Sequence, residues 1–224
     1  MSAITANLVN LGASIPASVK IVAVSKTKPV EDILEAYNAG QRIFGENRVQ
    51  EILKKKDQLP SDIEWHMIGH LQSNKVKEII PYVSMIQSVD TPKLMKVIDS
   101  ESAKAGRVTN ILLQLHIAEE ETKTGFSLRE LEDALASGIL NELHNLRICG
   151  VMGMATFTDN ESQIRKEFKS LSDSFKILRQ KYFPESFDFA EISMGMSGDH
   201  RIAVDEGSTM IRVGSLIFGE RIRG

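Results

Sequence analysis

The stretch KIVAVSKTKP, residues 20–29, is the first of the short apolar runs that decide the fold, and it ends in Lys26. Side chains alternate along a strand, so Val22, Val24 and Lys26 lie on one face of it. Apolar surroundings on that face disfavour the charged amine and lower its pKa. An uncharged amine at a strand end can form a Schiff base with an aldehyde cofactor. The alternative is a strand-end lysine that extends its charge into solvent.

Short apolar runs alternate with helical patterns along the chain. The helical pattern over residues 30–39 ends at Gly40, and the pattern over residues 92–105 ends at Gly106. Alternating strands and helices predict a parallel sheet, and eight such units can close into a (β/α)₈ barrel of the TIM type. The expected strands are residues 20–26, 42–46, 64–69, 85–90, 110–117, 146–154, 188–193 and 210–218. The expected helices are residues 30–39, 48–58, 92–105, 128–136, 161–182 and 200–206.

The two ends of the chain favour a closed barrel with an additional N-terminal helix. Residues 4–11 have a helical apolar face and no strand before them, so we expect this helix to cover the gap beside the eighth strand. An open doubly wound sheet is the alternative, but no Gly-x-Gly-x-x-Gly fingerprint follows the first strand. The sequence contains no linker-like stretch and no internal repeat, so residues 1–224 are predicted to form a single α/β barrel domain.

Composition excludes several classes of partner. The chain has 224 residues, of which 42% are hydrophobic and 25% charged, with a net charge of −3. We therefore expect no binding to nucleic acid or to anionic membranes. The single cysteine, Cys149, lies in an apolar run and is predicted to be a buried thiol in a reducing compartment. No signal sequence or membrane-spanning run is found, so a cytoplasmic protein is expected.

Two turns of small residues near the C-terminus are suited to bind a phosphate. They are SMGMSGD at residues 193–199 and IRVGS at residues 211–215, and each follows an apolar run. Glycine and serine let backbone N–H groups approach an anion closely, and the hydroxyl groups add donors. Glycine-rich turns also connect ordinary βα units, which is the alternative. Together with Lys26, the turns predict an aldehyde anchor beside a phosphate site.

Arg212 is predicted to lie inside the barrel. If Ile211 and Val213 face the helices, the arginine between them points inward. A buried guanidinium is costly unless it is paired. One interpretation is an internal salt bridge with Glu46 or Asp90. The other is donation to the nitrogen of a heteroaromatic ring, which would stay unprotonated because arginine holds its own proton far more tightly.

Several other residues are judged structural. His66 and His70 have the spacing of a helical zinc pair, but the pattern around them is strand-like, so no metal site is expected. His116 is expected to be a hydrogen-bonded core histidine. Lys54-Lys55-Lys56 is interpreted as a solvated helix end. Lys123 is interpreted as a solvated loop charge, the alternative being a second lysine over the barrel mouth.

Five segments together resemble the pyridoxal phosphate homeostasis proteins, relatives of the barrel domain of alanine racemase. The segments are AVSKTKP at residues 23–29, FGEN at 44–47, HMIGHLQSNK at 66–75, SMGMS at 193–197 and IRVGS at 211–215. The resemblance implies that pyridoxal 5′-phosphate is the cofactor and that Lys26 forms the Schiff base with it.

The resemblance also implies the remaining cofactor-binding residues. It assigns Ser197, Gly214 and Ser215 to the phosphate, Arg212 to the pyridine nitrogen and Asn47 to the neighbourhood of the ring. At Ser215 the family commonly has threonine, so a hydroxyl is retained.

The implied function is to bind, carry or buffer the cofactor in the cytoplasm, without established catalytic turnover. Pyridoxal-phosphate-dependent apoenzymes are the expected recipients, and the protein is expected to be a monomer. Gly198, which precedes Asp199, departs from the sequence pattern of the family, and this departure affects only the local turn.

Two other functions are weighed against this one. A racemase of the alanine racemase type needs a second acid–base group opposite the lysine, which alanine racemase takes from an extra C-terminal domain and a partner subunit. This chain ends within a few residues of Arg212, so a racemase is disfavoured. A barrel for some other phosphate ligand, with Lys26 as a charge partner, is the remaining alternative.

Overall fold

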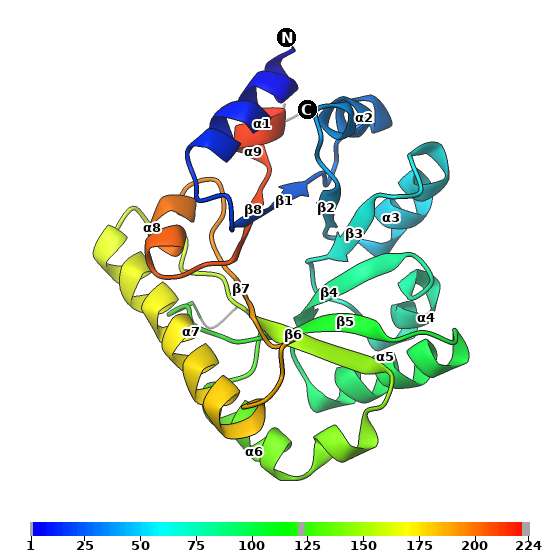
Figure 1. Ribbon diagram of the computed structural model, residues 1–224, viewed down its shortest axis with the longest axis vertical. Helices are drawn as coiled ribbons and strands as arrows, with labels where there is room; N and C mark the ends of the chain where they lie inside the picture. The colour runs from blue at the N-terminus through cyan, green and yellow to red at the C-terminus, as the bar shows by residue number, and fades with distance from the viewer. Residues whose placement is uncertain (1, 121–123, 221–224) are drawn as a thin grey trace.

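The computed structural model describes residues 2–120 and 124–220, and within them eight parallel strands close into a barrel in chain order (Figure 1). This confirms the predicted (β/α)₈ architecture. Each strand is hydrogen-bonded to the strands before and after it in the chain, and β8 pairs with β1. The strands are β1 (Lys20–Val24), β2 (Ile43–Glu46), β3 (Glu64–Met67), β4 (Val83–Val89), β5 (Thr109–Gln114), β6 (Leu146–Met152), β7 (Glu191–Ser193) and β8 (Met210–Val213).

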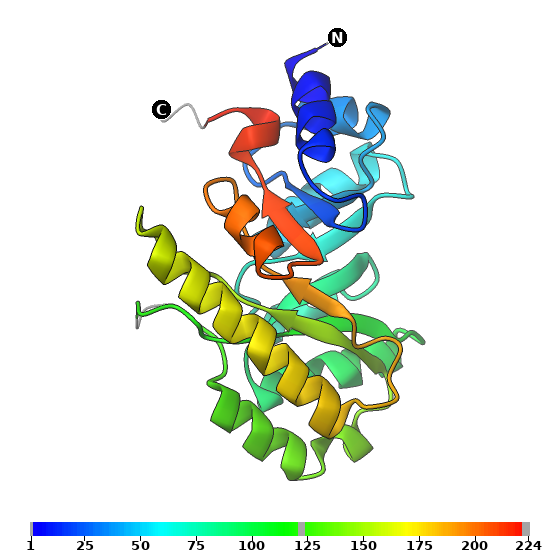
Figure 2. The same ribbon diagram turned by 60° about the vertical axis from the view of Figure 1, so that its left-hand side comes forward.

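Helices cover the outside of the barrel, as Figures 1 and 2 show. They are α1 (Ala3–Ala13), α2 (Val30–Asn38), α3 (Val49–Lys55), α4 (Val76–Ile79), α5 (Pro92–Lys104), α6 (Leu128–Ala136), α7 (Glu161–Tyr182), α8 (His200–Asp205) and α9 (Ser215–Phe218), with short 3₁₀ turns at Lys56–Gln58, Ser73–Lys75 and Ile139–Glu142. In the part of the chain that the structure describes, no helix is long and apolar enough to cross a membrane.

Helix starts follow side-chain capping. Thr91 accepts a hydrogen bond from the backbone N–H of Leu94, and Pro92 occupies the first turn, where no intrahelical donor is lost. Ser127 and Glu130 form a reciprocal capping box at the start of α6. These local signals explain why the predicted bounds of α5 and α6 agree closely with the structure.

The N-terminal helix α1 lies beside the last strand, as the sequence predicts. It packs against α9 and α2, and Asn7 of α1 donates to the carbonyl of Ile217 in α9 at 3.0 Å. Ile4, Leu8 and Leu11 form its buried face. The helix therefore covers the apolar surface that the short α9 leaves open.

The predicted strand over residues 210–218 is wrong in its second half. The strand ends at Val213, and Ser215–Phe218 is a one-turn helix, closed by the N–H of Phe218 on the carbonyl of Gly214 at 2.9 Å. A run of three apolar residues carries no period that separates a helix from a strand. The correction matters because it puts Ser215 at the first residue of a helix rather than inside a strand.

The interior of the barrel contains a layer of apolar side chains and, next to it, a group of polar side chains. Val22, Met85, Leu112, Cys149 and neighbouring methionines form an internal cluster that is separate from the larger core between strands and helices. Burial raises the pKa of the Cys149 thiol to about 11, which keeps it protonated, as expected for a structural cysteine. The packed layer means that the barrel is not a pore, and a site can form only at its end.

Candidate functional site

Four of the predicted site residues lie at the carboxyl-terminal end of the barrel, after β1 and its two neighbouring strands. Lys26 follows β1, Asn47 follows β2, and Gly214 and Ser215 follow β8, and these three strands are neighbours in the barrel. Lys26 and Asn47 are half-buried, and Ser215 is exposed. Active sites of such barrels form at this end, from the loops that follow the strands.

Gly214 is in close contact with the strand that carries Lys26. A Cβ added at Gly214 would lie 3.2 Å from the carbonyl oxygen of Val24 and 3.5 Å from its Cβ. The absence of a side chain therefore serves the packing of β8 on β1. Lys28 strengthens the same junction, because its ammonium donates to the carbonyl of Phe218 in α9 at 2.8 Å.

The turn between β7 and α8 holds Ser197. Gly195 has a φ of +95°, and a Cβ there would lie 2.6 Å from that of Ala203, so glycine is required on both grounds. Ser197 and Leu216 of α9 line one hollow of about 520 Å³, so the turn and α9 face each other. A Cβ at Gly198 would meet nothing within 4 Å, so this departure from the family pattern has no steric cause.

Arg212 points into the barrel and is only 4% exposed. Its Nη1 donates to the Ser193 hydroxyl at 2.7 Å, and its Nη2 donates to the Gly153 carbonyl at 2.9 Å. Burial lowers the pKa of the guanidinium to about 10, and the Asp199 carboxylate opposes that shift. Arg212 therefore keeps its charge at neutral pH, and the part of the chain that the structure describes uses two of its five N–H donors.

The internal salt bridge suggested for Arg212 is not the arrangement found. The carboxylate of Glu46 pairs with Lys55 at 2.7 Å, and that of Asp90 pairs with His70 at 3.1 Å. Arg212 is held by neutral oxygen atoms instead. A guanidinium paired only with neutral acceptors keeps a net positive charge inside the barrel.

A hydrogen-bonded chain behind Arg212 crosses the barrel. The Ser193 hydroxyl donates to Gln87 Oε1 at 2.7 Å, and Gln87 Nε2 lies 2.8 Å from His66 Nδ1. Arginine can only donate, so the serine hydrogen must point to Gln87, whose amide then donates to His66. Burial lowers the pKa of His66 to about 3, consistent with a neutral ring that accepts at Nδ1. This chain of hydrogen bonds is not among the features predicted from the sequence, although polar residues at inward positions on β3, β4 and β7 are the signal for it.

Lys55 is buried, which contradicts its interpretation as part of a solvated helix end. It is 8% exposed and pairs with both Glu46 and Glu51. Burial raises the pKa of Glu46 to about 7, and the hydrogen bonds from Lys55 and Ser25 oppose that rise. Lys54 and Lys56 point in other directions from the helix axis, so only the middle lysine of the run, Lys55, faces the barrel.

The remaining candidates have structural partners. His66 bonds to Gln87 and His70 to Asp90, and the described residues contain no group of three or more side chains placed to hold a metal ion. His116 is half-buried and bonds to the carbonyl of Glu120 at 2.9 Å. Lys123 lies outside the described residues.

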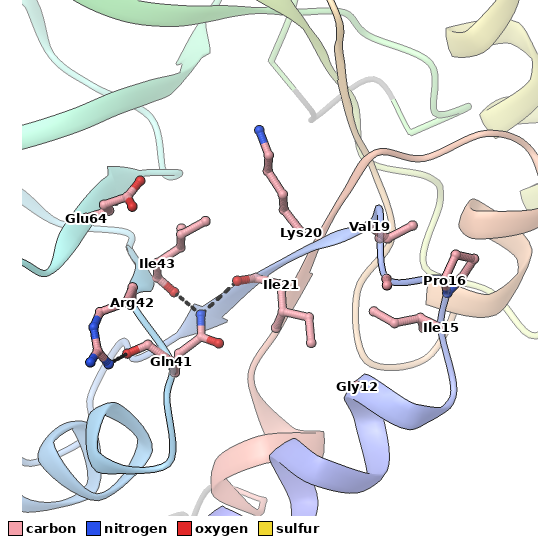
Figure 3. A pocket seen from close by; sticks show the side chains of 11 residues that line it. Gly12, Ile15, Pro16, Val19, Lys20, Ile21, Gln41, Arg42, Ile43 and Glu64 are labelled. Atoms are coloured by element: carbon pink, nitrogen blue, oxygen red, sulfur yellow. Dashed lines mark hydrogen bonds between the residues drawn. The ribbon is translucent and has the colours of Figure 1, made fainter.

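A second hollow, of about 380 Å³, lies at the opposite end of the barrel (Figure 3). It is lined by the starts of β1, β2 and β3 and the end of α1. Gln41 donates to the carbonyls of Ile21 and Ile43 there, at 2.8 and 2.6 Å, which ties β1 to β2. Polar residues at this end of a barrel serve stability rather than chemistry.

Comparison with protein families identifies close relatives of this chain. The family model for the alanine racemase N-terminal domain matches residues 1–222. A pyridoxal phosphate homeostasis protein of Aquifex aeolicus is 38% identical over 203 residues, which cover 90% of this chain and 87% of that protein. The human protein of the same name is 38% identical over 211 residues, which cover 90% of this chain and 76% of the human one.

Solved structures agree with this relationship. PipY of Synechococcus elongatus without PLP has a TM-score of 0.91 and 37% identity, covering 96% of this chain and all of PipY. PipY with PLP bound has a TM-score of 0.88 and 36% identity at the same coverage. An alanine racemase of Clostridium difficile has a TM-score of 0.77 at 15% identity and covers 99% of this chain and 57% of the racemase, a likeness of fold alone.

Proposed function

Because this chain belongs to the alanine racemase N-terminal domain family, and within it to the pyridoxal phosphate homeostasis proteins, we propose that it binds pyridoxal 5′-phosphate at the carboxyl-terminal end of its barrel. The observation that carries the proposal is the placement of Lys26 after β1, of Arg212 within the neighbouring strand β8, and of Ser215 after β8. The amine suits the aldehyde of this cofactor, the guanidinium suits its pyridine nitrogen, and the hydroxyl suits its phosphate.

The chemistry of the donor set fits the group. Pyridoxal phosphate supplies an aldehyde that an uncharged primary amine attacks, with loss of water and formation of a carbon–nitrogen double bond. Lys26 is the amine in this proposal. Its place in the turn after β1 puts it at the end of the barrel where Asn47 and Gly214 also lie.

The phosphate is assigned to Ser197, Gly214 and Ser215. The two hydroxyl groups can each donate to a phosphate oxygen, and the backbone at Gly214 can approach one closely. Support comes from the hollow that Ser197 shares with Leu216, the residue after Ser215, although Gly214 and Ser215 themselves do not line it. Ser215 is exposed, so its hydroxyl is accessible to a ligand.

The pyridine nitrogen is assigned to Arg212, and Asn47 lies near the ring. In this proposal the ring nitrogen accepts from one of the three N–H donors of Arg212 that Ser193 and Gly153 do not use. With a pKa of about 10, the guanidinium holds its proton far more tightly than a pyridinium does. The ring nitrogen bound to it therefore stays unprotonated, which weakens the ring as an electron sink.

The proposed role is to hold and release the cofactor rather than to turn over a substrate. In this proposal residues 1–224 act as one cofactor-binding unit, a monomer in the cytoplasm that passes pyridoxal phosphate to apoenzymes which depend on it. The names of the relatives support this role. A racemase of the alanine racemase type is the alternative, supported by the family model.

The test is a titration of the purified protein with pyridoxal phosphate, followed by absorption and equilibrium dialysis. We expect the wild type to gain a visible band that borohydride abolishes, and Lys26→Ala to lack the band while it stays folded. Lys93→Ala, which removes an exposed lysine on α5, is the control and should match the wild type. A band that persists in Lys26→Ala after dialysis would contradict the assignment.

A further inference from the structure

The turn that carries Lys26 has a strained backbone. The N–H of Lys28 donates to the carbonyl of Ser25 at 3.0 Å, so Lys26 and Thr27 are the central residues of a tight turn. Thr27 has a φ of +66°, and within the described residues it is the one non-glycine residue with a positive φ. A β-branched residue in this conformation is strained, so the surrounding structure must hold it there.

Lys55 holds the residue before Lys26. It is the last residue of α3, and its ammonium donates to the Ser25 carbonyl at 3.0 Å, to Glu46 Oε1 at 2.7 Å and to Glu51 Oε2 at 3.0 Å. An ammonium has three N–H donors, and all three are used. Its position is therefore fixed, and it in turn fixes Ser25.

The two carboxylates complete the hold on either side of Lys26. Glu46 Oε1 accepts from the Ser25 hydroxyl at 2.7 Å, and Glu51 Oε2 accepts from the N–H of Thr27 at 2.6 Å. Glu46 is completely buried, and its Oε2 has no hydrogen-bond partner among residues 2–120 and 124–220. Burying the Glu46 carboxylate with one unpaired oxygen is unfavourable, and the hydrogen bonds from Lys55 and Ser25 to the other oxygen hold it in place.

We propose that Lys55, Glu46 and Glu51 form a positioning cluster that holds the Ser25–Thr27 turn in its strained conformation, so that the amine of Lys26 faces the carbonyl carbon of the cofactor. The inference rests on the proposed function of Lys26 and adds residues to it. A lysine on a loose turn samples many positions, whereas one on a fixed turn is already placed for reaction. None of the three cluster residues is proposed to contact the cofactor.

The test compares two ligands that differ in one functional group, an aldehyde in one and an aminomethyl group in the other. Pyridoxal 5′-phosphate can react with Lys26, whereas pyridoxamine 5′-phosphate has no aldehyde and uses only the phosphate and ring contacts. In Lys55→Met, we expect pyridoxal phosphate to bind about tenfold more weakly or worse, with pyridoxamine phosphate affinity unchanged. Lys169→Met, which breaks an exposed i,i+4 ion pair on α7, is the matched control and should change neither.

Glu51 provides a second, less buried test in case Lys55→Met does not fold. Glu51→Ala removes the acceptor for the Thr27 N–H and should selectively weaken pyridoxal phosphate binding. Glu51→Gln keeps an acceptor oxygen and should restore most of it. Equal loss for both ligands would mean a general structural role and would overturn the proposal, as would wild-type affinity in Glu51→Ala.

Failure of this inference and failure of the proposed function give different results. If the wild type binds pyridoxal phosphate without a borohydride-sensitive band, the assignment of Lys26 is wrong. If the wild type has the band and the cluster variants keep it with unchanged pyridoxal phosphate affinity, the assignment of Lys26 is supported and the positioning role of the cluster is wrong.

Discussion

The guanidinium of Arg212 donates to the hydroxyl of Ser193 at 2.7 Å, inside a barrel where no carboxylate pairs with it among the described residues. Its orientation therefore depends on a neutral hydroxyl and a backbone carbonyl. The serine is fixed in turn by Gln87, and Gln87 by His66. A residue proposed to meet the cofactor is thus positioned by three side chains that lie deeper in the barrel.

Ser193→Ala should destabilise the fold. The substitution removes the acceptor of an Arg212 N–H and the donor to Gln87 Oε1, and both atoms are buried. Leaving buried polar groups unpaired costs about 1–3 kcal/mol in the free energy of unfolding, measured by urea denaturation. Ser61→Ala, at an exposed position, should change the free energy by less than about 0.5 kcal/mol. Equal stability of both variants would contradict the chain of hydrogen bonds.

His66 should make stability depend on pH on the acid side. Its folded pKa of about 3 lies below the usual 6.5, so the unfolded chain binds a proton that the folded one does not. Stability is then complete above about pH 6.5 and falls as the pH drops toward 3, by roughly 1.4 kcal/mol per pH unit.

His66→Gln keeps an acceptor for Gln87 and cannot titrate, so it is the variant that isolates this effect. Between pH 6 and pH 4, we expect the free energy of unfolding to fall more steeply in the wild type than in His66→Gln. Glu46, whose pKa is raised to about 7, titrates in both proteins and cancels in the comparison. Parallel pH profiles would show that His66 is not held neutral.

Ser215→Ala should affect the phosphate selectively. Ser215 is exposed, so its loss should leave the fold intact, and a missing hydrogen bond to a charged oxygen should weaken pyridoxal phosphate binding about tenfold. Pyridoxal, which has no phosphate, should bind the variant and the wild type equally in a spectroscopic titration. A matching loss for both aldehydes would remove Ser215 from the phosphate site.

Racemization should be negligible. If Arg212 binds the ring nitrogen as proposed, the cofactor is a weak electron sink, and proton removal from a bound amino acid is correspondingly disfavoured. We expect L-alanine incubated with the loaded wild type to racemize no faster than with free pyridoxal phosphate, as followed by chiral chromatography. Rapid racemization that disappears in Lys26→Ala would establish an enzyme of the racemase type instead.

The architecture could be predicted because strand and helix periods, caps and closing glycines are local signals. The bounds of α6 and α7 agree with the prediction to the residue, while the strand over residues 210–218 failed where an apolar run changes from strand to helix at Gly214. The inward direction of Arg212 was predictable from alternation along β8, and the structure confirms it.

The partners of these residues could not be predicted, because they depend on which side chains the closed barrel brings together. Arg212 was expected to pair with a carboxylate if it was structural, yet it bonds to Ser193 from a strand 19 residues earlier. The run of three lysines predicts a solvated Lys55, whereas the packing of α3 on the barrel turns this side chain inward to Glu46. Both cases are long-range contacts that a local pattern does not contain.

Lys26 is the residue proposed to form the covalent link to pyridoxal phosphate. The most direct test of this link is reduction of the loaded wild-type protein with borohydride, proteolysis, and identification of the pyridoxyl-labelled peptide by mass spectrometry. We expect stoichiometric label on Lys26 and none on Lys28 or Lys55. Label at another lysine, or a loaded protein that borohydride cannot label, would contradict the account.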